Sequence, residues 1–364
     1  MTRERPPDER LALLQSWLQQ LPHRLELQPQ TLRPASSDAS FRRYFRIDAG
    51  ADAVSAAASS FGSSIAPPGV GSLIVMDAPP AHEDCRPFLH VAGLLARQGV
   101  STPQLIASDL DLGFLLLSDF GSITYADAML REETDVAALY ADALAALLRL
   151  QQARPGTSVP AYDRGRLLAE MRLFPDWYVA QHLGMELTAS ERGVLDATFD
   201  ILVDAAVAQS QVLVHRDYHC RNLMVLDPRE RNPGVLDFQD AVLGPITYDL
   251  VSLLRDAYVE WPEARQLDWA ARYWELAREA GLPVPEKFDV FWRDLEWMGL
   301  QRGLKVLGIF ARLYHRDGKS RYLADLPLVL KHTQRVAERY DAFSRLARLL
   351  ERVHQHSPLT GYTF

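Results

Sequence analysis

The stretch LVHRDYHCRNLMVLDPRERNPGVLDFQD, residues 213–240, places two polar clusters between short apolar runs. The first cluster, HRDYHCRN at 215–222, has the form H-x-D-x-x-x-x-N, and Asp237 follows Asn222 by fifteen residues. The runs at 212–214, 223–226 and 234–236 predict short strands that hold both clusters on loops. Any one of these polar residues alone is typical of a turn. Together they are the set that phosphoryl transfer needs, with Asp217 as the base for the attacking hydroxyl and with Asn222 and Asp237 as Mg²⁺ ligands.

Length and composition set limits on the class of protein. A chain of 364 residues, 48% hydrophobic and 24% charged, can form two lobes with a large core. The net charge of -8 argues against a nucleic-acid partner. With only two cysteines, Cys85 and Cys220, a disulfide framework is not expected and a reducing compartment fits. Because no apolar run reaches the roughly 18 residues of a spanning helix and no signal-peptide core appears, we expect a cytoplasmic protein without a membrane partner. We also expect a monomer.

The periodicity of apolar residues changes near residue 118. Before it, the pattern predicts a leading helix at 8–21, strands at 31–35, 41–47, 72–76, 105–108 and 114–117, and one helix at 85–98. After it, long helices are expected at 134–152, 166–182, 190–209, 247–258, 266–281, 288–314 and 326–353. The expected fold class is α+β, with a small, mainly antiparallel β N-terminal lobe at 1–118 and a larger, mostly helical C-terminal lobe at 119–364.

The segments HRDYHCRN and LDFQDAVLGPITYDL (236–250) resemble the aminoglycoside phosphotransferase and choline kinase-like family. The resemblance implies a two-lobed protein kinase-like fold with ATP and Mg²⁺ as cofactors and the nucleotide in the cleft between the lobes. It also implies a structural role for Asp249, and a role for His219 in orienting the catalytic loop or contacting the substrate. The apolar run that ends in Ser118, Asp119 and Phe120 would be the hinge that binds adenine.

The chain departs from the family in one respect. Related kinases carry a lysine on the third strand of the small lobe to hold the nucleotide phosphates, and the corresponding run LIVMD (73–77) has none. The segment SSDASFRRYFR (36–46) could replace it. Ser37 and Ser40 would cover the phosphates, and Arg43 or one of its neighbouring arginines would supply the positive charge.

A protein kinase is the first alternative, because HRD and DFQ look like protein-kinase signatures. Such an enzyme would also carry G-x-G-x-x-G, a strand lysine and an activation segment ending in A-P-E. The sequence contains none of these, and Asp237 leads within about ten residues into the helix expected at 247. A literal DFG at 119–121 precedes the catalytic loop and belongs to the expected hinge.

Four further segments narrow the resemblance: PASSDASFRRY (34–44), VMDAPP (75–80), RLFPDWY (172–178) and LGIFARLYHRDGK (307–319). They are similar to bacterial amino-sugar kinases of peptidoglycan recycling, which phosphorylate the anomeric hydroxyl. The implied substrates are N-acetylmuramic acid and N-acetylglucosamine, with Arg172, Asp176, Arg312 and His315 as candidate substrate contacts. A choline, homoserine or aminoglycoside kinase of the same fold remains an alternative, and so does a nucleotide-binding pseudokinase.

Overall fold

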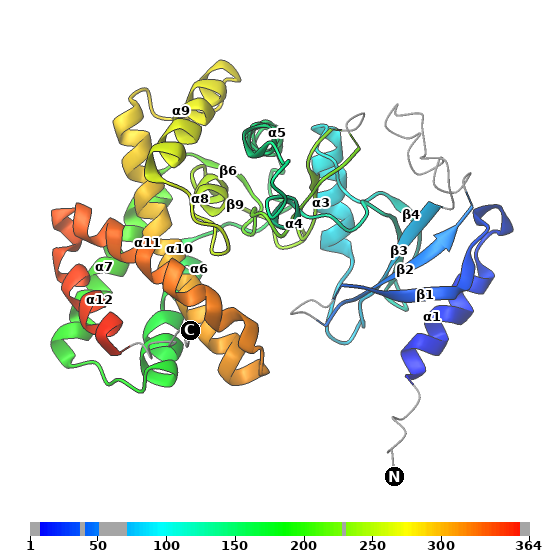
Figure 1. The fold of residues 1–364 in the computed structure, drawn as a ribbon, viewed down its shortest axis with the longest axis horizontal. Coiled ribbons are helices and arrows are strands. Elements are labelled where there is room, and N and C mark those ends of the chain that lie inside the picture. The colour runs from blue at the N-terminus through cyan, green and yellow to red at the C-terminus, as the bar shows by residue number, and fades with distance from the viewer. Residues whose placement is uncertain (1–7, 37–40, 51–70, 228–230, 357–364) are drawn as a thin grey trace, which may run out of the picture. The chain divides into compact units, whose positions relative to one another are not determined.

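The computed structural model describes residues 8–36, 41–50, 71–227 and 231–356. Contacts divide the chain into two compact units (Figure 1). Unit 1 consists of residues 1–123 with 224–240, and unit 2 consists of 124–223 with 241–364. No helix in the described ranges is long and apolar enough to cross a membrane.

Unit 1 contains an antiparallel sheet, as the sequence predicts. Within the described residues it has five strands in the order β1-β2-β3-β5-β4. In the register of β2 and β3, Arg43 lies opposite Asp77 and Ala49 lies opposite Gly71. The strands are β1 (Gln28–Ser36), β2 (Arg43–Ala49), β3 (Gly71–Asp77), β4 (Leu105–Asp109) and β5 (Phe114–Ser118).

One face of this sheet is covered by helix α1 (Glu9–Gln20), whose N-terminus is capped by the Asp8 side chain. Trp17 of α1 packs in one buried cluster with Ile47 and Val75 of the sheet. Because side chains alternate along a strand, Tyr44 and Met76 project from the opposite face. Another helix of the unit, α3 (Arg86–Arg97), buries an apolar stripe that includes Phe88.

The segment 224–240 belongs to unit 1, although in chain order it falls in the range expected for the helical lobe. Val225 N–H donates to the carbonyl of Ile123 (2.9 Å), and Val235 N–H donates to that of Ser101 (2.7 Å). The rings of Phe88 and Phe238 lie 4.8 Å apart. These partners are distant in the sequence, so chain order alone could not assign the segment.

Unit 2 is mostly helical. Its helices are α4 (Tyr125–Ala128), α5 (Val136–Gln151), α6 (Arg164–Met171), a π-helix (Phe174–His182), α7 (Ala189–Ala208), α8 (Tyr248–Leu254), α9 (Glu263–Glu279), α10 (Phe288–Asp317), α11 (Leu326–Arg339) and α12 (Ser344–His356). Two short strands, β6 (Gln211–Val214) and β9 (Val242–Pro245), pair antiparallel. Helix α10 contacts α6, α7, α8, α9 and α11, and is therefore buried along most of its length.

Two of the expected helices are broken. The range 166–182 divides into α6 and the π-helix, and Pro175, which has no N–H to donate, lies in the first turn of the latter. The range 326–353 divides at a short 3₁₀ turn, Asp341–Phe343. Phe343 is fully buried there, and its ring centroid lies 4.9 Å from that of Trp297. The turn between α11 and α12 allows the Phe343 ring to be buried against Trp297 of α10. This burial stabilises the break in the helix.

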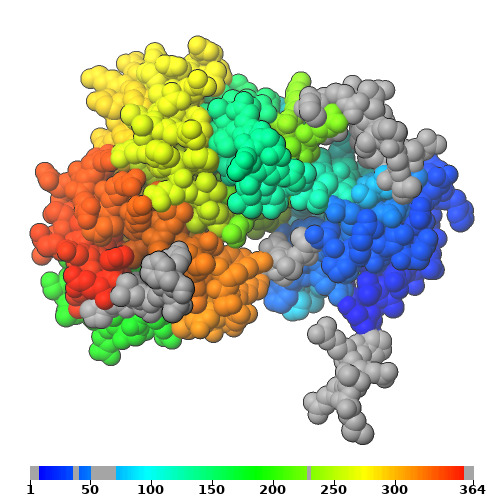
Figure 2. All heavy atoms as spheres, viewed as in Figure 1, coloured from blue at the N-terminus to red at the C-terminus, as the bar shows by residue number. Residues whose placement is uncertain are grey.

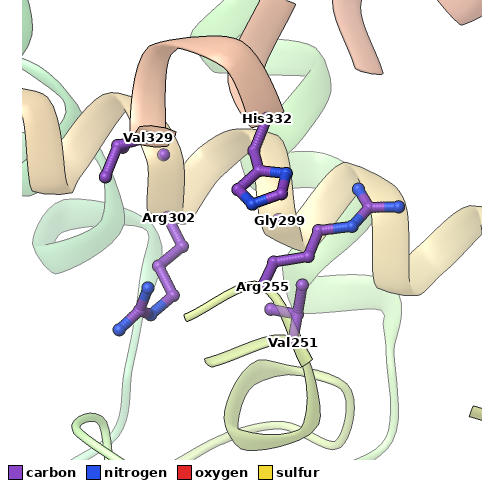
Figure 3. Close-up of a pocket in the computed structure, with 7 residues that line it drawn as sticks. Val251, Arg255, Gly299, Arg302, Val329 and His332 are labelled. Atoms are coloured by element: carbon purple, nitrogen blue, oxygen red, sulfur yellow. The ribbon is translucent and has the colours of Figure 1, made fainter. Parts of the chain in front are cut away.

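A small cavity lies where α8, α10 and α11 meet (Figure 3). Its volume is about 20 Å³, room for about one water molecule. Figure 3 shows His332 of α11 close to Arg255, while Arg302 of α10 extends in the opposite direction. The helices approach closely because Gly303 faces Thr333, and a Cβ at Gly303 would overlap the threonine hydroxyl.

Candidate active site

The loop between β6 and β7 (Leu223–Met224) carries the catalytic motif within unit 2. Asp217 is partly exposed on this loop. The side-chain amide of Asn222 donates from Nδ2 to the Asp217 carbonyl (2.9 Å), which fixes the orientation of the amide. Its Oδ1 is then the atom that can bind a cation. An amide oxygen is a suitable ligand for Mg²⁺, so this part of the site fits the predicted metal.

Two buried carboxylates hold the catalytic loop from either end of α8. Asp249, in the first turn of α8, accepts the backbone N–H groups of His215 (2.6 Å) and Arg216 (3.0 Å). Asp256, just after α8, accepts the N–H of Cys220 (2.9 Å). Burial raises the pKa of Asp249 to about 7, against the opposing effect of the two backbone hydrogen bonds. Asp249 therefore has the structural role that the resemblance implied.

Arg216 has a left-handed backbone conformation, with φ of 81°. Such a conformation in a non-glycine residue costs on the order of 1–3 kcal/mol and persists only when the surroundings hold it. The surroundings here are the Asp249 clamp on its N–H and Glu170, which accepts from the Arg216 guanidinium (2.5 Å). Both the backbone and the side chain of Arg216 are thus held in place.

Glu170 also binds Lys305, whose Nζ lies 3.3 Å from Oε2. Lys305 comes from the middle of α10, its side chain is 5% exposed, and it also donates to the Tyr248 hydroxyl (2.9 Å). Burial raises the pKa of Glu170. The positive charges of Lys305 and Arg216 lower it by more than burial raises it, so the net shift of the pKa is downward. The pair is therefore an ionised, buried ion pair beside the catalytic loop.

The charge of Asp217 depends on the same surroundings. Desolvation raises its pKa, but electrostatic interactions with Lys305, His219 and Arg302 outweigh this effect and lower the pKa to about 2. Asp217 is consequently ionised at neutral pH, which a proton acceptor requires.

His219 is part of the catalytic loop, and its side chain is nearly buried. Its ring meets that of Tyr258 edge-on at 5.3 Å, and Arg221 lies over the same tyrosine ring at 3.5 Å. His219 Nδ1 has no hydrogen-bond partner among the described residues. The packing agrees with a role in orienting the loop, and substrate contact by His219 stays a prediction.

The second predicted metal ligand, Asp237, lies in unit 1. It too has a left-handed backbone, with φ of 62°, and its Oδ1 accepts from the Gln239 side-chain amide (2.6 Å). The neighbouring Phe238 is fully buried. The Asp237 carboxylate is thus held in a strained turn next to a buried side chain. This agrees with its predicted role as a metal ligand, because backbone strain of this kind concentrates at functional sites.

The side chains at the expected adenine hinge form hydrogen bonds and contacts within unit 1. Asp119 accepts from Arg46 Nη2 (2.9 Å) and Ser72 (2.6 Å). Ser118 Oγ accepts from Gln104 N–H (2.9 Å), and Phe120 covers the backbone at Gly234. Contacts from this hinge to adenine would therefore come from backbone groups.

The residues expected at the nucleotide phosphates are described only in part. Ser37 and Ser40 lie outside the described residues. The Arg43 guanidinium binds Asp77, its cross-strand partner, and also Asp8 just before α1. Asp77 is fully buried and binds Arg10 of α1 as well. Arg43 is thus committed to the contact between α1 and the sheet.

The candidate substrate residues lie on the π-helix region and on α10. Arg172 and Asp176 are exposed next to and within the π-helix, and His315 is exposed near the C-terminal end of α10, orange in Figure 2. Arg312 is partly buried on α10, and its Nε has no hydrogen-bond partner among the described residues. Burial and the nearby Arg316 lower the pKa of Arg312, while Glu170 acts in the opposite direction.

Sequence reasoning missed Glu170, Arg302 and Lys305. A signal was present for the last two, because both interrupt the otherwise apolar middle of α10. A helix that is apolar on all sides is buried, and a charge within it then needs a partner or a function. Nothing in the sequence around Glu170 distinguishes it from an exposed helical glutamate.

Comparison with known proteins supplies the class of chemistry. The model of the phosphotransferase enzyme family matches residues 31–288, well over half of the chain. The chain belongs to the phosphotransferase enzyme family. This phosphotransferase is 47% identical over 330 residues to the N-acetylmuramate/N-acetylglucosamine kinase of Pseudomonas aeruginosa, covering 91% of the chain and 90% of the relative. It is 46% identical to the kinase of the same name from Neisseria meningitidis serogroup B, covering 98% and 100%.

Solved structures agree on the fold of the phosphotransferase. The GDP complex of aminoglycoside 2'-phosphotransferase-IIIa matches with a TM-score of 0.58 at 14% identity, covering 90% of this chain and 98% of that one. The ADP-bound aminoglycoside phosphotransferase APH(2'')-Ib matches with a TM-score of 0.54, also at 14% identity, covering 90% and 98%. The α+β, protein kinase-like fold is confirmed, and the chain is a phosphotransferase enzyme.

Proposed function

We propose that this phosphotransferase uses ATP and Mg²⁺ to phosphorylate the C1 hydroxyl of N-acetylmuramic acid and N-acetylglucosamine, in peptidoglycan recycling toward UDP-sugars. The observation that carries the proposal is the high identity, 44–47% over at least 91% of the chain, to three kinases named for these two sugars. The proposal includes a cytoplasmic monomer, which size-exclusion chromatography would test.

The chemistry follows from the catalytic loop. Asp217, ionised and held by the clamped loop, accepts the proton of the attacking hydroxyl. The hemiacetal hydroxyl at C1 is more acidic than an ordinary sugar alcohol and so requires less of the base. Asn222 and Asp237 would hold Mg²⁺, which neutralises charge on the phosphates during transfer. Specificity then depends on clamping the ring so that only O1 is in line with the γ-phosphate.

The Arg312 guanidinium on α10 supports an anionic substrate over the cationic alternatives. N-acetylmuramic acid carries a lactyl carboxylate, whereas choline and aminoglycosides are cations. Arg312 lies on this helix seven residues after Lys305, on the same side. Lys305 is paired with Glu170, whereas Arg312 Nε has no hydrogen-bond partner among the described residues. In the proposal, Arg312 pairs with the lactyl carboxylate, because a guanidinium binds a carboxylate with two parallel hydrogen bonds.

The decisive experiment compares each free sugar with its 1-O-methyl glycoside, which differs only at the proposed nucleophile. Coupled ADP release should occur with both free sugars and should be absent with both glycosides. Phosphorus NMR should show a glycosyl phosphate coupled to the anomeric proton. A 6-phosphate product, or rapid turnover of a methyl glycoside, would exclude the C1 assignment. Faster turnover of choline, homoserine or an aminoglycoside would instead favour the alternative substrates.

A further inference from the structure

The phosphotransferase has no lysine on β3, the strand that reads GSLIVMD. In protein kinases a β3 lysine binds the nucleotide phosphates and is held by a glutamate of the following helix. The compensating cation should lie on the face of the sheet opposite α1, close to the C-terminal half of β3. The adjacent strand β2 begins next to that half, because Tyr44 pairs with Met76.

Three arginines lie in or directly before β2, and each of them binds a carboxylate. Arg43 binds carboxylates on the α1 side of the sheet. Arg46 donates to both carboxylate oxygens of Asp119 and to the carbonyl of Gly121. Their guanidinium groups therefore hold α1 and the hinge in place.

Arg42 binds a carboxylate at a different place, next to the helix that follows β3. Its Nε and Nη2 donate to one oxygen of Glu83, at 3.1 and 2.9 Å, and the two side chains are only 10% and 15% exposed. Arg42 directly precedes β2 and lies two residues before Tyr44, which projects from the face opposite α1. Glu83 precedes α3, the helix that follows β3 in the chain. Arg42 is therefore a cation near the end of β3, and the glutamate that holds it lies next to the following helix. This pair resembles the lysine–glutamate pair of protein kinases, although both residues occupy different positions in the sequence.

Two further observations place Arg42 within a fixed site in unit 1. Phe41 stacks on His82 with ring centroids 4.5 Å apart, so consecutive residues at the start of β2 are fixed to consecutive residues before α3. Burial lowers the pKa of Arg42, but the nearby Tyr44, Glu83 and Asp240 raise it, so the net shift is upward. Asp240 follows the predicted metal ligand Asp237 by three residues.

We propose that Arg42, held by Glu83, is the residue that binds the nucleotide phosphates in place of the missing β3 lysine. A guanidinium carries five N–H donors in a plane and can serve a carboxylate and a phosphate together. The ion pair with Glu83 holds the side chain in one orientation before the nucleotide binds. The inference rests on the nucleotide-dependent activity of the family and is independent of which sugar is phosphorylated.

The test is calorimetric titration of ADP, Mg·ATP and adenosine into Arg42→Met without any sugar. Affinity for ADP and Mg·ATP should fall by roughly ten- to a hundredfold, the usual effect of losing hydrogen bonds to a charged group, while adenosine binding stays within about twofold. The matched control is Arg33→Met, which removes an exposed arginine of the same sheet that pairs with Asp48. It should leave all three affinities unchanged.

Glu83→Gln provides a second variant that keeps the arginine and removes the charge that orients it. It should weaken ADP binding by several-fold and leave adenosine unaffected, and circular dichroism would check that each variant is folded. Unchanged ADP affinity in Arg42→Met would overturn the proposal, and so would an equal loss for adenosine. If Arg42→Met does not fold, unchanged ADP affinity in Glu83→Gln overturns it instead. A failure of the sugar assignment would leave these binding results intact.

Discussion

Replacing Lys305 by methionine should destabilise the phosphotransferase far more than the same change at Lys331. Both lysines pair with a glutamate in unit 2. Lys305 lies 3.3 Å from Glu170, with side chains 5% and 15% exposed. Lys331 lies closer to its partner Glu260, at 2.7 Å, but these side chains are 53% and 44% exposed. Distance alone would rank the exposed pair as the stronger one, whereas burial ranks it as the weaker.

The magnitudes follow from the dielectric surroundings. At 3.3 Å and an effective dielectric constant of about 20, the gross attraction is about 5 kcal/mol, whereas at 2.7 Å in water it is about 1.5 kcal/mol before screening and side-chain entropy. Measured exposed pairs contribute about 0.2–1 kcal/mol, and breaking a buried pair costs about 3–5 kcal/mol. Glu170 keeps Arg216 as a partner, and methionine keeps most of the apolar stem of Lys305. We therefore expect a loss of about 3 kcal/mol for Lys305→Met and less than about 1 kcal/mol for Lys331→Met.

Urea denaturation followed by tryptophan fluorescence and by far-ultraviolet circular dichroism would measure both losses. The free energies of unfolding are comparable where the two signals coincide and the urea dependence is unchanged. Adding Glu170→Gln to Lys305→Met should deepen the loss, because it also removes the carboxylate acceptor of the Arg216 guanidinium. Equal costs for the two lysine variants, or a cost below about 1 kcal/mol for Lys305→Met, would refute the reasoning.

Three further outcomes are expected. Asp217→Asn should abolish turnover and leave Mg·ATP affinity within about twofold, because the amide keeps the shape but cannot accept the proton; near-normal turnover would remove Asp217 from the role of base. Burial lowers the pKa of His332 from 6.5 to about 4. Between these two pH values the ring stays neutral in the folded state but binds a proton in the unfolded state. The free energy of unfolding should therefore fall by up to about 3 kcal/mol as the pH drops from about 6.5 to 4. His332→Gln should lose less stability over that range in urea titrations, and an equal loss would contradict the assignment. Arg312→Gln should raise KM for N-acetylmuramic acid roughly tenfold and leave KM for N-acetylglucosamine within about twofold, and equal changes for both sugars would exclude selective pairing with the carboxylate.

The sequence by itself determined the features whose partners lie close together in the chain. The spacing of Asp217 and Asn222 sets the 2.9 Å hydrogen bond that closes the catalytic loop, because the two residues are five apart. Apolar periodicity predicted the antiparallel sheet and most of the helices, since each depends on which residues of a short window must be buried. The metal and base roles of these residues stay predictions until the variants are measured.

Tertiary structure decided what depends on partners far apart in the chain. Arg216 is held by Glu170, 46 residues away, and Lys305 by Tyr248, 57 residues away. The Arg42 and Glu83 pair lies 41 residues apart and joins the start of β2 to the segment before α3. The free energy of burying a charge depends on everything packed around it, which a local pattern does not contain. A lysine inside an apolar helix signals only that a partner must exist, and the packing of α10 against α6 and α8 identifies it.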